Sequence, residues 1–82
     1  MEQIIYGNIY NESLEVVKRD SKFYIRYDAG AHQVIWREDE ITKEEAESII
    51  YNSSAVSSVL WNVQARLTQQ GSKRPKSNWN PS

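Results

Sequence analysis

The sequence contains no cysteine, one histidine, two prolines and three glycines in 82 residues. The absence of cysteine excludes disulfides, thiolate nucleophiles and Cys-ligated zinc, so a domain of this size depends on packing, alone or with a partner. Three glycines cannot form a phosphate-binding loop, and no G-x-S-x-G motif is present. Because no apolar run reaches 18 residues and the N-terminus lacks a basic region, we expect no membrane segment and a cytoplasmic protein.

Catalytic and metal-ligating residues are equally scarce. The only plausible catalytic pair is His32 with Asp28, and no serine motif accompanies it. The acidic residues Glu38, Asp39 and Glu40 are adjacent, whereas a calcium loop requires alternating ligands. We therefore expect no enzymatic activity, no cofactor and no metal site.

Charge is unevenly distributed along the chain. Residues 1–47 contain all eleven acidic residues and six basic ones, whereas residues 48–82 contain four basic residues and no acidic one. An isoelectric point near 5.8 argues against general coating of DNA. Residues 71–82 are polar, basic and contain proline, so we expect a disordered tail after a single domain formed by residues 1–70.

The first forty residues are rich in β-branched and aromatic side chains, which is typical of strands. Residues 22–28 alternate with a period of two, and Gly7 indicates a bulge or an edge position. We expect an α+β fold, an antiparallel meander of three or four strands followed by a helix packed on one sheet face. The expected strands are 3–10, 13–19, 22–28 and 32–38. The side chains expected to face the helix are Phe23, Ile25, Tyr27, Val34 and Trp36.

Thr42 and Glu45 form a capping box, which predicts that a helix begins at residue 43. Apolar residues then recur at intervals of three and four. Residues 52–54 (Asn-Ser-Ser) are weak helix formers and good N-caps. We therefore expect a kinked or broken helix with segments 43–51 and 54–70. The alternative is one continuous helix that overhangs the sheet and pairs with a second copy.

The second helical segment is poor in charge. From residue 48 to residue 70, Arg66 is the only charged residue, whereas exposed helices normally carry interleaved charges. Val59 and Trp61 widen the apolar arc of this helix. The arc is wider than that of a helix that packs against other residues on one side only. Such a helix could pack against its own sheet on one side and against another molecule on the other. The alternative is that the strands and the first helix of the monomer cover both sides. The predicted partner-binding residues are Tyr51, Val59, Trp61 and Arg66, with Trp61 as the anchor.

These features predict a small protein-interaction module, acting as a regulator, inhibitor or assembly adaptor, that binds another protein and self-associates as a homodimer through residues 54–67. The alternative is a nucleic-acid-binding domain, because bases on the outer sheet face would bind phosphates and an aromatic ring would stack on bases. The residues of that alternative site are Arg19, Lys22, Tyr24, Arg26, Arg37, Lys73, Arg74 and Lys76.

Residues 22–50 place two strands before a helix that begins T-K-E-E-A. This order resembles in outline the small arm-site DNA-binding domains of tyrosine recombinases, and the resemblance implies DNA recognition by a three-stranded sheet. Glu38, Asp39 and Glu40 would repel phosphates at that position, so no residue role is transferred from that family.

Overall fold

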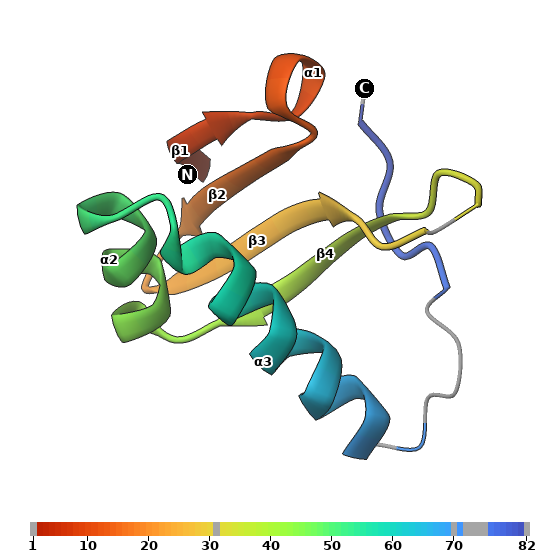
Figure 1. The fold of residues 1–82 in the computed structure, drawn as a ribbon. Helices are drawn as coiled ribbons and strands as arrows, with labels where there is room; N and C mark the ends of the chain where they lie inside the picture. Colours follow the sequence, from red (N-terminus) through yellow and green to blue (C-terminus); the bar gives the residue numbers. More distant parts are fainter. Residues whose placement is uncertain (1, 31, 70, 72–75, 82) are drawn as a thin grey trace.

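The computed structural model describes residues 2–30, 32–69, 71 and 76–81. Four strands form one antiparallel sheet in the order β1-β2-β3-β4, and α2 and α3 cover one of its faces (Figure 1). The predicted α+β meander followed by a broken helix is confirmed. The elements in chain order are β1 (Glu2–Asn8), α1 (Ile9–Glu12), β2 (Leu14–Arg19), β3 (Lys22–Asp28), β4 (Trp36–Ile41), α2 (Lys43–Tyr51) and α3 (Ala55–Gln69).

The break between α2 and α3 lies where the sequence predicts it. Asn52 ends α2, and its Oδ1 accepts hydrogen bonds from the backbone N and the Oγ of Ser54. The backbone N of Ala55 then donates to the carbonyl oxygen of Asn52 as α3 begins. At the start of α2, Thr42 and Glu45 form both hydrogen bonds of the predicted capping box. Local side-chain bonding thus sets both ends of α2.

The core lies between the helices and one face of the sheet. Val59 and Val63 of α3 are buried with Ala46 and Ile49 of α2. Val59 thus belongs to the core, because the helical period places it on the same side of α3 as Val63. The strands β2, β3 and β4 supply the remaining buried members of this cluster, which are Val16, Ile25, Tyr27 and Ile41.

The last strand is shifted from its predicted position. β4 covers Trp36–Ile41 in place of residues 32–38, and its register sets Arg37 opposite Tyr27 and Trp36 opposite Asp28. Residues directly opposite each other in antiparallel strands share a face. Because Tyr27 is a core residue, Arg37 lies on the helix side and Trp36 on the opposite side. The predicted facing of both side chains is therefore wrong.

Residues before β4 form a loop that Asp28 holds. Its Oδ1 accepts hydrogen bonds from the backbone N of Gly30 at 2.8 Å and of Ile35 at 2.9 Å. Val34 is exposed in this loop, so the prediction that it faces the helix is wrong. His32 is exposed as well. The Asp28 carboxylate therefore organises the loop backbone.

The first strand is shorter than predicted. β1 ends at Asn8, whose side chain accepts hydrogen bonds from the backbone N of Tyr10 and Asn11 and so starts the short α1. The expected irregularity near Gly7 is present, because the register shifts between Ile4 and Tyr6 and β1 is an edge strand. Gly7 has a φ of +75°, a conformation that favours glycine.

Candidate functional site

The outward side of α3 carries no charge. Trp61 is the largest side chain on it and is 74% exposed. An exposed helix face normally mixes charged residues with polar ones, so this face differs from an ordinary solvated one. The exposed residues of α3 are Ser57, Ser58, Trp61, Asn62, Gln64, Ala65, Thr68 and Gln69. We call this set the α3 face.

The one charged residue of α3 is neutralised inside the monomer. Arg66 Nη2 donates to Glu45 Oε1 at 3.0 Å and to Oε2 at 3.3 Å. Burial opposes ionisation of Glu45, but hydrogen bonds from the Thr42 backbone and from Arg66 outweigh it and lower the pKa of Glu45. The ion pair ties α3 to the start of α2. It also leaves the α3 face without a net charge.

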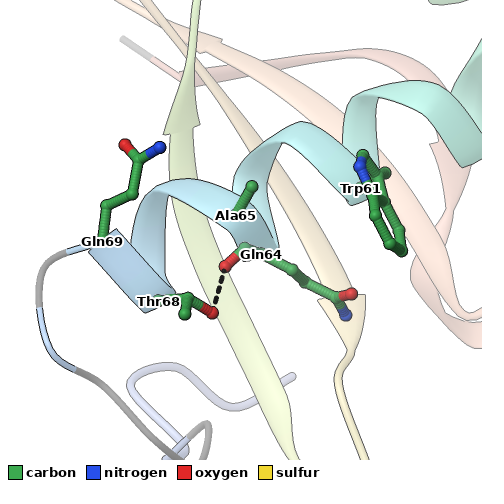
Figure 2. Close-up of a pocket in the computed structure, with 5 residues that line it drawn as sticks. All are labelled: Trp61, Gln64, Ala65, Thr68 and Gln69. Atoms are coloured by element: carbon green, nitrogen blue, oxygen red, sulfur yellow. Dashed lines mark hydrogen bonds between the residues drawn. The ribbon is translucent and has the colours of Figure 1, made fainter.

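A shallow hollow runs along the α3 face (Figure 2). Within the part of the chain that the structure describes, its lining residues come from α3, and the Thr68 hydroxyl donates to the carbonyl oxygen of Gln64. One side of a helix does not enclose a small molecule, whereas sites for small ligands bury most of the ligand. Its shape suits contact with another macromolecular surface. The lining residues are Trp61, Gln64, Ala65, Thr68 and Gln69.

The structure separates the four predicted partner-binding residues. Trp61 is on the α3 face, as expected, and Val59 is in the core. Arg66 is held by Glu45. Tyr51 is the exposed last residue of α2 and is not part of the hollow. Trp61 is thus the one predicted residue that the α3 face retains.

The sheet face opposite the helices contains a buried ionic cluster. Glu15, Arg26 and Glu38 lie directly opposite one another on β2, β3 and β4. Arg26 donates to Glu15 Oε2 at 2.8 Å, to Glu38 Oε2 at 2.7 Å and to Glu2 Oε1 at 2.8 Å. Arg26 is 6% exposed and Glu15 3%. Glu15 Oε1 also accepts a hydrogen bond from the backbone N of Ile9 in α1.

Arg19 extends the same cluster at its exposed side. It binds Glu38 and Glu2, and its guanidinium lies 4.6 Å from the centre of the Tyr24 ring. The hydrogen bond from Arg19 is the main reason that the pKa of Glu2 is lowered. Two of the arginines predicted to contact nucleic acid therefore already bind carboxylates, and this arrangement would weaken attraction for phosphates.

The other predicted nucleic-acid residues are placed differently from one another, and Lys22 lies directly opposite Arg19 in the sheet. Arg37 lies on the helix side, where it donates to both carboxylate oxygens of Asp39. Lys22 is exposed at the start of β3. Lys73 and Arg74 lie outside the described residues. The carbonyl oxygen of Lys76 accepts a hydrogen bond from Arg37 Nη1.

Asp39 joins β3 and β4 on the helix side. Tyr27 Oη donates to Asp39 Oδ2 at 2.7 Å. Burial and this hydrogen bond raise the pKa of Tyr27. Burial opposes ionisation of Asp39, but the hydrogen bonds from Arg37 and Tyr27 outweigh it and lower the pKa of Asp39. Asp39 therefore stabilises the fold as a carboxylate.

Residues 76–81 contact β4, a contact that the sequence does not predict. Asn78 bonds the backbone of Trp36 and Glu38, and the Trp79 ring lies 4.5 Å from the Arg26 guanidinium carbon. The uncharged side chains of Asn78 and Trp79 make this contact, so no sequence pattern identifies it. The binding of Glu2, Glu15 and Glu38 by Arg26 depends on the register of the strands, so the sequence does not predict it either. The disorder expected for residues 71–82 stays a prediction.

The fold and these surfaces define a small α+β domain, a four-stranded antiparallel meander with two helices on one face. Comparison with protein-family models, with curated proteins and with solved structures gave no match. No helix in the described part of the chain is long and apolar enough to cross a membrane. Within residues 2–30, 32–69, 71 and 76–81, no three His, Cys, Asp or Glu side chains are grouped to hold a metal ion.

Proposed function

We propose that this protein is a non-enzymatic protein-interaction module that self-associates through the α3 face. The observation that carries the proposal is the uncharged α3 face with Trp61 at 74% exposure. Burying an exposed tryptophan side chain against another protein is favourable in free energy. Tryptophan is also enriched among the residues that contribute most of the binding energy at interfaces. A regulator, an inhibitor or an assembly adaptor would each use such a surface.

A second copy is the occupant that this surface fits best. In a two-fold symmetric dimer the same patch meets itself, so a patch with charge of one sign would face charge of the same sign. The α3 face avoids that repulsion, because Arg66 is paired with Glu45 inside the monomer. A strongly charged partner would find no complementary charge there. The face therefore favours its own copy over an acidic or basic partner.

The size of the face limits how tight the dimer can be. The 15 residues of α3 extend about 22 Å at 1.5 Å per residue, and a helix is about 10 Å wide. Two such faces bury roughly 450 Å², below the ~1,200 Å² of standard stable interfaces. We therefore expect a weak, reversible dimer with a dissociation constant of about 0.1–1 mM.

Sedimentation equilibrium of the full chain tests this proposal at concentrations from about 20 μM to 1 mM, a range that brackets the expected dissociation constant. The average mass should rise with concentration for the wild type and stay monomeric for Trp61→Ala. The matched control is Tyr10→Ala, because Tyr10 is another exposed aromatic residue, on α1. A wild type that stays monomeric, or a dimer that Trp61→Ala leaves intact, would overturn the proposal.

A further inference from the structure

The outer edge of β4 binds a segment from the far end of the chain. β4 is an edge strand, and Asn78 bonds its backbone three times. Asn78 N donates to the carbonyl oxygen of Trp36 at 3.3 Å, Glu38 N donates to Asn78 Oδ1 at 2.7 Å, and Asn78 Nδ2 donates to the carbonyl oxygen of Glu38 at 2.9 Å. An edge strand presents such groups to any extended chain beside it. Figure 1 shows this segment, in blue, beside β4.

The contact selects for particular side chains. The Asn78 amide accepts from and donates to the same residue, Glu38, whereas a carboxylate at this position could not donate. The next residue, Trp79, lies over the Arg26 guanidinium, 4.5 Å from ring centre to guanidinium carbon. The cation attracts the face of an aromatic ring, and an aliphatic side chain would lack this attraction. These two positions therefore match Asn followed by an aromatic residue.

Charge around the edge adds a further requirement. β4 carries Glu38, Asp39 and Glu40, and Glu2 joins the cluster next to Arg26. The sequence from residue 48 onward contains four basic residues and no acidic one. An acidic segment would be repelled from this edge, whereas a neutral or basic one is compatible with it.

We infer that the edge of β4, together with Arg26, is a docking site for an extended peptide of another protein, neutral or basic, that carries Asn followed by an aromatic residue. Residues 76–81 are its resident competitor and must leave before the foreign peptide binds. The inference uses residues distant in sequence from the α3 face and does not depend on dimer formation. The proposed site consists of the backbone groups of β4 and the Arg26 guanidinium, over which one aromatic ring stacks.

A titration followed by NMR tests the inference. The probe is a synthetic peptide with the sequence of residues 76–81, added to the ¹⁵N-labelled full chain. A full-chain variant with Asn78→Asp and Trp79→Leu vacates the site without changing the sheet or core. The peptide should shift the Glu38 amide and the Trp36 indole of this variant until saturation. The wild type should need about two- to tenfold more peptide, because its tethered tail competes at an effective concentration on the order of millimolar.

Two controls decide between outcomes. A peptide with Asp in place of Asn should shift neither signal of the vacated variant. Equal titration of wild type and variant, no saturable shift of the variant, or equal binding of the Asp peptide would each overturn the inference. Sedimentation equilibrium of the wild type and of Trp79→Leu shows whether residues 76–81 of one copy bind the β4 edge of a second copy, because such an exchange would form a dimer that depends on Trp79. A dimer that needs Trp79 would overturn the inference by assigning the site to the tail of a second copy, whereas a dimer that needs Trp61 reports on the α3 face alone.

Discussion

Replacing Arg26 by methionine should destabilise the protein severely. Methionine fills similar space but leaves Glu15, which is 3% exposed, without its cationic partner. Removing one member of a buried ion pair costs about 3–5 kcal/mol, because the remaining charge stays desolvated. Glu38 retains Arg19, and Glu2 is exposed enough to regain water, so neither adds much to the loss. A small domain has a free energy of unfolding of roughly 5–10 kcal/mol, and the variant should lose about half of it.

Urea unfolding followed by circular dichroism measures this loss, and a second variant identifies its cause. With an m-value of about 1 kcal/mol per molar urea, the midpoint should fall by about 3–5 M. Adding Glu15→Gln to Arg26→Met removes the stranded charge and keeps an acceptor for the backbone N of Ile9, so stability should partly return. A loss below about 1 kcal/mol for Arg26→Met, or no recovery in the double variant, would refute the buried cluster.

Four further results are expected. Gly7→Ala should lower the free energy of unfolding by more than about 1 kcal/mol in urea, since Gly7 has a φ of +75° and an added Cβ would lie 2.5 Å from the Leu14 carbonyl oxygen. Thr42→Ala should cost about 0.5–2 kcal/mol in the same assay by removing the N-cap of α2. The lowered pKa of Asp39 contributes stability above its ordinary pKa of 3.8 that is lost as pH falls through the lowered value, so unfolding followed from pH 7 downward should show a loss that Asp39→Asn reduces. Labelled single- and double-stranded DNA should not bind at low salt, because Arg19 and Arg26 are paired with carboxylates; binding that weakens steeply with salt would contradict this.

Local sequence signals account for α2 and for the start of α3. The capping box at Thr42 and the run of poor helix formers at residues 52–54 act on neighbouring backbone groups, so their effects can be recognised without knowing the rest of the fold. The alternation in residues 22–28 predicts β3 with the observed bounds, Lys22–Asp28. These elements are set by interactions within a few residues.

Position and register of β4 depend on distant contacts, and here sequence reasoning fails. The strand contains the acidic run Glu38, Asp39 and Glu40, which has low strand propensity. Arg26 on β3 binds Glu38. Arg37 and Tyr27 bind Asp39. A shift of one residue reverses the facing of every side chain in a strand.

The candidate surfaces were predictable to different degrees. Trp61 stands out in a stretch almost without charge, so its exposure could be anticipated. Val59 and Trp61 lie on opposite flanks of the apolar stripe, and a wide apolar arc does not show which flank the monomer covers. The contacts of Asn78 and Trp79 join residues some forty to fifty positions apart, and no local pattern in the sequence indicates them.

The concentration dependence of the ¹H–¹⁵N spectrum of the full chain tests most directly whether the α3 face binds a second copy. Between about 50 μM and 1 mM, concentrations that span the expected weak dimer, the Trp61 indole and the amides of the α3 face should shift progressively. Signals of Tyr10 and Val34, which are exposed elsewhere, should stay constant. An unchanged spectrum, or shifts confined to residues away from α3, would contradict the account.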